Sequence, residues 1–216
     1  MLRALHRRDL ECVKFLLAAG ADPNEPRDPY DRTASHRPAF EAIHSHRLDL
    51  LAAVVEGGAD IEATDGAPQA TFGGTGLTLL CWATFNASQD STKGDIELVR
   101  YLLSRGAQVD HGKADGFTPF MFATEGGRMD LIELLFNAGA DVNTANISGV
   151  TPLMAAGDFP EVVEYLLNRG ANMDARISEG YSIICHAMVR KHTKKVATLV
   201  AHGAASDPAC RISSEP

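Results

Sequence analysis

Residue patterns that could perform catalysis or hold a metal ion are few in this chain, and each has a simpler explanation. The segment 72–76 (FGGTG) is glycine-rich, but no lysine follows it and no apolar strand precedes it, so it does not indicate a phosphate-binding loop. His44 and His46 are two residues apart at an expected helix end, which is poor geometry for joint ligation. Cys185 and His186 are adjacent, so on a helix they point about 100° apart and are poorly placed as a nucleophile–base pair. We assign no catalytic residue, no metal ligand and no cofactor.

The composition restricts the class of partner and the compartment. The formal net charge of −8 makes nucleic acid an unfavourable partner. The four cysteines, Cys12, Cys81, Cys185 and Cys210, are scattered without CxxC spacing, which suggests no disulfide framework and predicts a reducing compartment. The N-terminal segment lacks the apolar region of a signal peptide, and no stretch approaches the length of a membrane span. We therefore expect a cytoplasmic protein, with the nucleus as the alternative.

One short phrase recurs six times along the chain. Its clearest copies are LLAAGADPN (16–24), LLFNAGADVN (134–143) and LLNRGANMD (166–174). The glycine before each alanine lies at Gly20, Gly58, Gly106, Gly139, Gly170 and Gly203, which gives steps of 38, 48, 33, 31 and 33 residues. A period near 33 is typical of stacked two-helix units, which cannot bury their apolar faces alone. The functional groups of such a chain lie on its surface, and this favours binding over catalysis.

Residues 116–143 illustrate one unit. Thr118 followed by Pro119 is a helix start, because the hydroxyl can cap and proline suits the first helical position. The first helix is expected to run to about Glu125, where two glycines break it. A second helix follows, whose apolar stripe comprises Leu131, Ile132, Leu134 and Leu135. Gly139 fits a left-handed residue at the end of this helix, because it has no Cβ.

These features together resemble the ankyrin repeat, with its G-x-T-P-L-H-x-A start, its short turn between helices and its LLxxGADVN end. The resemblance covers about residues 1–206 and implies a mainly α repeat solenoid: antiparallel helix pairs, each with a β-hairpin loop, stacked in one domain. The expected repeats are 1–24, 25–62, 63–110, 111–143, 144–174 and 175–206, followed by a flexible tail at 207–216. The family's inner helices and hairpin tips usually form a concave binding surface.

The chain departs from the family pattern in two respects. The histidine of TPLH is replaced throughout, by Phe40, Cys81, Met121, Met154 and Cys185, so its usual hydrogen bonds must be made by other groups. The sixth repeat has Lys195 and Thr198 at apolar positions, which predicts a solvent-facing C-terminal cap.

The irregular steps locate insertions and one deletion. The hairpins at 24–37 and 62–78 have five and eight extra residues, and the third repeat has seven more between its helices, around 86–94. A two-residue deletion near Asp158 and Phe159 accounts for the step of 31. Long loops in compact repeats often carry function.

Two rows of side chains follow from the repeat register and are our candidate partner-binding residues. The first row precedes the Thr-Pro position and consists of His36, Leu77, Phe117, Val150 and Tyr181. The second lies on the inner helices, where Trp82 and Phe122 are expected to be neighbours, with Phe85 and Glu125 one turn further on. Aromatic residues dominate interface energies when a partner covers them. The competing explanation for both rows is packing within the repeats.

The sequence therefore predicts a non-catalytic protein-interaction module, monomeric by itself, that holds a protein or peptide segment. The alternative is the ankyrin portion, or a regulatory subunit, of a larger enzyme whose catalytic part lies outside this chain. Asn143 also resembles the hairpin asparagine that oxygenases hydroxylate in the family, although the same residue has a structural role there.

Overall fold

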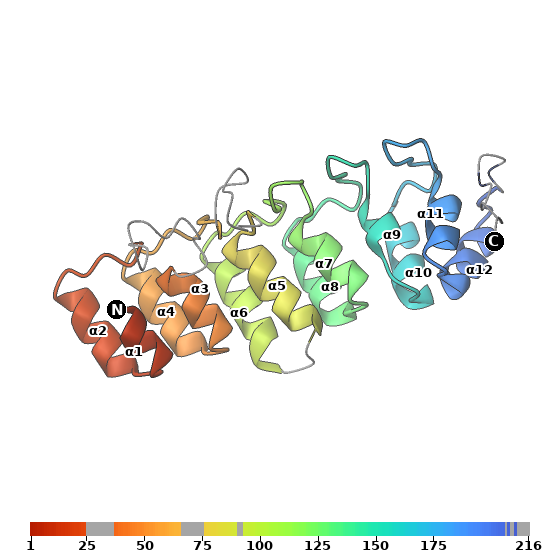
Figure 1. The fold of residues 1–216 in the computed structure, drawn as a ribbon. Helices are drawn as coiled ribbons and strands as arrows, with labels where there is room; N and C mark the ends of the chain where they lie inside the picture. Colours follow the sequence, from red (N-terminus) through yellow and green to blue (C-terminus); the bar gives the residue numbers. More distant parts are fainter. Residues whose placement is uncertain (25–36, 66–75, 90–92, 206, 208–209, 211–216) are drawn as a thin grey trace, which may run out of the picture. The chain divides into compact units, whose positions relative to one another are not determined.

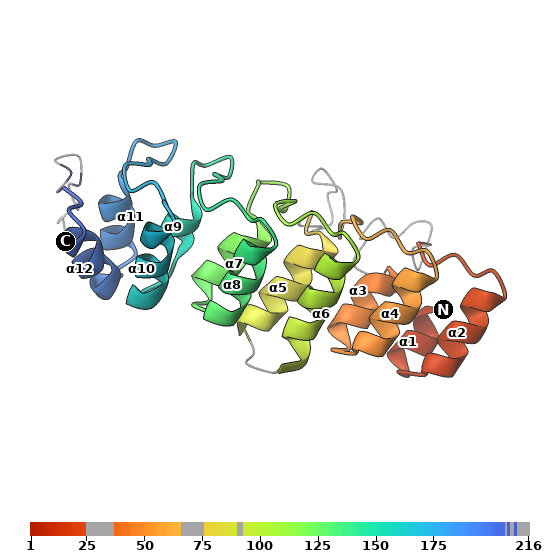
Figure 2. The same cartoon turned by 180° about the vertical axis from the view of Figure 1, so that it is seen from behind.

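The structure is a computed structural model that describes residues 1–24, 37–65, 76–89, 93–205, 207 and 210. Its contacts divide the chain into two compact units, Met1–Ala114 and Asp115–Pro216. In the described part of each unit the helices form three consecutive pairs, and in the second unit the loops that join one pair to the next lie along one edge (Figures 1 and 2). The described residues contain no named strand, only two isolated antiparallel bridges, Thr64 with Thr78 and Arg176 with Ser182. The predicted class of helical repeat protein is confirmed.

The first unit begins with two short helix pairs. Its helices are α1 (Leu2–His6), α2 (Leu10–Ala18), α3 (Pro38–His44), α4 (Leu48–Glu56), α5 (Leu79–Gln89) and α6 (Lys93–Ser104). The inner helices α1, α3 and α5 contact each other in sequence, as do the outer helices α2, α4 and α6. The predicted insertion at 86–94 partly lengthens α5, which continues to Gln89, and the predicted hairpin insertions lie mostly in residues 25–36 and 66–75, outside the described part.

The second unit repeats this arrangement with one shortened helix. Its helices are α7 (Pro119–Glu125), α8 (Met129–Asn137), α9 (Pro152–Ala155), α10 (Pro160–Asn168), α11 (Ile183–Val189) and α12 (Thr193–Ala201). Helix α9 has only four residues, because the chain leaves the helical conformation at Ala156. This is where the sequence predicts the two-residue deletion.

Local capping explains where the helices start and stop. The Thr118 hydroxyl accepts a hydrogen bond from the Met121 amide at 3.3 Å, and Thr78, Thr151 and Ser182 cap their helices in the same way. Gly126 ends α7 as predicted, and Gly139 adopts a φ of 100° just after α8. In α8, Leu131, Ile132 and Leu135 are fully buried, whereas Leu134 is half-buried.

An asparagine at the end of a repeat connects it to the next repeat. Asn143 donates to the Gly170 carbonyl at 3.1 Å and accepts from the Asn172 amide at 2.7 Å. Asn24 makes the same pair of bonds with Gly58 and Asp60 in the first unit. We call this two-bond arrangement the asparagine clasp.

Candidate functional site

Trp82 lies at the centre of an aromatic cluster on the inner helices of the first unit. Its ring centroid is 5.1 Å from that of His44 on α3 and 6.3 Å from that of Phe85, one turn along α5. Trp82 and Phe85 are half-buried, and His44 is exposed. Among the described residues, no acceptor lies within reach of the buried Trp82 Nε1. A half-exposed indole ring is suited to contact a partner through its apolar surface.

The inner-helix surface of the first unit is polar beside this cluster. His6 of α1 lies 3.4 Å from the Glu41 carboxylate on α3. Glu41 occupies the position in its repeat that Trp82 occupies in the next. The surface therefore combines an acidic group, two histidines and two aromatic rings, and none of these side chains is fully buried.

Phe117 and Phe122 form the corresponding aromatic pair in the second unit. Their rings meet edge to face with centroids 4.8 Å apart. Phe117 is half-buried, but Phe122 is only 9% exposed and belongs to the core of its repeat. Glu125 at the end of α7 is exposed. Trp82 and Phe122, expected as neighbours, belong to different compact units, so each is described only within its own unit.

The side chains of the first row, which precede the helix starts, differ in how far they are buried. Leu77 is only 6% exposed, and its main chain pairs with Asp65 across the hairpin, so it has little surface to offer a partner. Val150 is half-buried and Tyr181 is 40% exposed. His36 lies outside the described residues. The competing explanation, packing within the repeats, therefore holds for Leu77 and Phe122 in this structure.

Other groups replace the hydrogen bonds of the missing TPLH histidine in the third repeat. The Thr78 hydroxyl donates to the His111 carbonyl at 3.2 Å, and the Cys81 thiol lies 3.5 Å from the same oxygen. In this repeat the role therefore passes to neighbouring side chains.

Lys195 is fully buried, which corrects the prediction that it faces solvent in a C-terminal cap. Its Nζ donates to the carbonyl oxygens of Met154 at 2.9 Å and Ala156 at 2.6 Å. Because α9 is so short, these carbonyls lack the helical partners that a longer helix would supply. The Asp158 carboxylate accepts from the Lys195 amide at 2.9 Å and so caps α12. Burial, with a smaller contribution from Arg190 and against the attraction of Asp158, lowers the pKa of Lys195 to about 7.

The structure joins Cys185 to Cys210 in a disulfide, with their Cα atoms 5.2 Å apart. The scattered cysteine spacing gave no indication of this bond, because residues brought together by the fold need no short sequence motif. Asp207, also from the expected tail, accepts from Arg176 at 2.8 Å. The remaining tail residues, 208–209 and 211–216, lie outside the described part.

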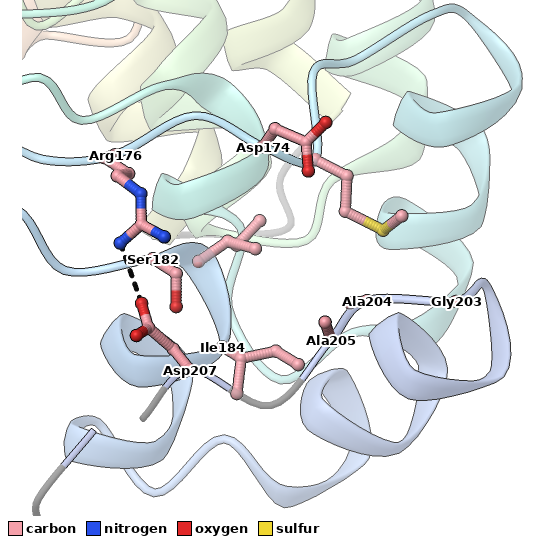
Figure 3. A pocket seen from close by; sticks show the side chains of 10 residues that line it. Asp174, Arg176, Ser182, Ile184, Gly203, Ala204, Ala205 and Asp207 are labelled. Carbon is pink, nitrogen blue, oxygen red and sulfur yellow. Dashed lines mark hydrogen bonds and ion pairs between the residues drawn. The ribbon is translucent and has the colours of Figure 1, made fainter. Parts of the chain in front are cut away.

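Arg176 and Asp207 lie beside a small pocket of about 290 Å³ (Figure 3). Asp174 lines it opposite the main chain of Gly203 and Ala205. Asp174 occupies the register position of Asn143, but a carboxylate cannot donate to the Gly203 carbonyl. The pocket therefore lies where the asparagine clasp is incomplete, and we attribute it to that substitution.

The contact of the Arg169 guanidinium with two aromatic rings on the outer helices was not predicted. The Arg169 guanidinium lies 4.6 Å from the centre of the Phe136 ring and 4.4 Å from that of Tyr165, and it donates to the Tyr165 hydroxyl at 2.8 Å. The spacing of Tyr165 and Arg169, four residues apart on a helix, was a signal that could have revealed half of it.

The described residues were also searched for metal-binding groups and membrane spans. No group of three or more His, Cys, Asp or Glu side chains in that part of the chain could hold a metal ion. No helix in the described segments is long and apolar enough to cross a membrane.

Comparison with known families agrees with this architecture. The model for three consecutive ankyrin repeats matches residues 68–146 and 85–177, and the single ankyrin-repeat model matches residues 2–28. The chain belongs to the ankyrin-repeat family. Ankyrin repeats are generally protein-interaction modules and typically non-catalytic. A comparison with curated proteins found no match.

Proposed function

We propose that this ankyrin-repeat protein is a non-catalytic interaction module that binds a protein or peptide segment through its inner helices and hairpin tips. The observation that carries the proposal is the half-exposed Trp82, placed between His44 and Phe85. Such an indole supplies a large apolar area to a partner, which is the chemistry of interface hot spots.

The proposed contact residues are the exposed and half-buried members of the predicted rows. In the first unit these are Trp82 and Phe85, joined by His44. In the second unit they are Phe117, Glu125, Val150 and Tyr181. Leu77 and Phe122 would act by supporting these residues from the core.

Affinity capture from source-cell lysate tests the proposal. The wild-type chain is compared with a folded Trp82→Ala/Phe117→Glu/Tyr181→Glu variant, and captured proteins are identified by mass spectrometry. We expect a small set of proteins to be lost with the variant. Identical sets would remove these surfaces from consideration. Recovery of a single catalytic polypeptide as the lost protein would favour the regulatory-subunit alternative.

A matched control distinguishes binding through this surface from nonspecific binding by exposed aromatic side chains. Phe15 on α2 is 71% exposed, on an outer helix of the same unit. The Phe15→Ala variant should retain the captured proteins that Trp82→Ala loses.

A further inference from the structure

A second surface stands out in the C-terminal repeat. A groove of about 540 Å³ runs from the hairpin before α11, along that helix, to the turn that follows it. Its walls carry the apolar side chains of Tyr181, Met188 and Val189, of which Tyr181 is 40% and Val189 69% exposed. The volume falls within the range of about 300–1,000 Å³ that is typical of ligand-binding sites.

The charge around this groove is opposite to that of the whole protein. The segment 181–206 contains four lysine or arginine residues and no aspartate or glutamate, whereas the full chain has a net charge of −8. Arg190 and Lys191 line the groove and are exposed, and Glu179 of the hairpin is the acidic residue that faces them. Lys195, buried in the same repeat, is close enough to affect the pKa of His186.

His186 lies in an environment that is partly buried and positively charged. His186 lines the groove, and its pKa is lowered to about 4, first by burial and then by Arg190, Lys195 and His192. Its Nδ1 is buried and finds no hydrogen-bond partner among the described residues. At neutral pH the His186 imidazole in the wall of the groove is thus neutral, and the nearby cations are Arg190 and Lys191.

Lys191 is also held in an unfavourable backbone conformation. Its φ of 59° lies in the left-handed region, and Gly127 occupies the corresponding turn of an earlier repeat. A residue with a Cβ is less favourable there than glycine, so the cationic side chain is present despite a local cost.

We propose that the α11 groove binds a short acidic segment of a partner protein that carries large apolar side chains beside its carboxylates. The apolar walls accept the side chains, and Arg190 and Lys191 pair with the carboxylates. An anionic membrane or nucleic acid fits less well, because the exposed rim has only two strong cations and the rest of the chain repels phosphates.

The site is separate from the surface proposed above, because it lies on α11 and uses neither Trp82 nor Phe85. Tyr181 is shared between the two proposals. Trp82→Ala and Arg190→Glu/Lys191→Glu each change only one of the two surfaces, so these variants let the two proposals fail independently.

A displayed library of random peptides tests the chemistry directly. The wild-type chain is used for selection, and an Arg190→Glu/Lys191→Glu variant for counter-selection. We expect enriched peptides to combine Asp or Glu with Leu, Phe, Tyr or Trp. The best peptide should bind the charge-reversed variant about tenfold or more weakly by fluorescence anisotropy, and its affinity should fall as salt is raised.

The first repeat provides a matched control. Arg7 and Arg8 occupy the same turn positions as Arg190 and Lys191, and Arg8 has the same left-handed φ, at 56°. The Arg7→Glu/Arg8→Glu variant changes the net charge equally and should bind the peptide as the wild type does. Trp82→Ala should also leave this binding unchanged.

The inference would be overturned by no enrichment, by enriched peptides without an acidic excess, or by equal losses in both charge-reversed variants. If the Arg190→Glu/Lys191→Glu protein does not fold, Val189→Ser serves instead, because this exposed side chain lines the groove and contributes little to the core. That variant should weaken binding without lowering the thermal midpoint. Binding that depends on protein self-association, seen by sedimentation, would assign the groove to a second copy and also contradict the proposal.

Discussion

At the scale of single residues, the asparagine clasp depends on the side-chain amide nitrogen, because this is the donor that an aspartate lacks. The Asn143 amide both donates to Gly170 and accepts from Asn172. An aspartate at the same position can only accept, so Asp174 cannot make the donor half of the clasp with Gly203. The last repeat is joined to the one before it by other bonds, among them those of Lys195 to Met154 and Ala156.

We predict that Asp174→Asn stabilises the protein. The new amide can donate to the Gly203 carbonyl, and such a bond contributes about 1 kcal/mol. The free energy of unfolding, measured by urea titration, should rise by about that amount. The reciprocal change Asn143→Asp should lower it. A destabilised Asp174→Asn protein would show that the pocket in Figure 3 has another cause.

The lowered pKa of Lys195 predicts how the free energy of unfolding depends on pH. Its pKa is about 7 in the folded protein and is ordinarily 10.5. Below pH 7 it is protonated in both states; between 7 and 10.5 the unfolded chain binds more protons, so the free energy of unfolding rises with pH. The thermal midpoint should rise across this window in wild type and in the exposed neighbour variant Lys194→Met. Lys195→Met should lose this part of the rise, and an unchanged slope would contradict the assignment.

At the scale of elements, the turn between the two helices of a repeat has a fixed backbone requirement. Gly127 meets it with a φ of 70°, and a Cβ there would lie 2.7 Å from the Phe159 ring. Arg8 holds the same left-handed conformation without being glycine, at a φ of 56°. The turn geometry is therefore imposed by the two helices and not by the residue at the turn.

We predict opposite effects for substitutions at these two turns. Arg8→Gly should stabilise the first unit by up to about 1 kcal/mol, because relief of the left-handed strain exceeds the entropy cost of glycine. Gly127→Ala should destabilise the second unit, because it adds both strain and a clash with Phe159. Differential scanning calorimetry of the two variants would measure both changes. An Arg8→Gly protein less stable than wild type would contradict this account of the turn.

At the scale of the whole molecule, the repeat, the helix starts and the position of the deletion could all be predicted from the sequence. Thr118 and Gly139 perform local roles that depend on few neighbours. The burial of Lys195 and the Cys185–Cys210 bond could not be predicted, because both depend on groups at least 25 residues away in the chain. The candidate rows were partly predictable, since register places a residue in a row without fixing its burial, as Leu77 and Phe122 illustrate.

The central claim, that partner binding covers the Trp82 surface, can be tested through that residue itself. Trp82 is the only tryptophan of the chain, so 5-fluorotryptophan labelling gives one fluorine resonance. Titration with a captured partner should shift or broaden this resonance, with the same midpoint as binding measured by calorimetry. A partner that binds tightly by calorimetry while the resonance stays unchanged in position and width would contradict the account.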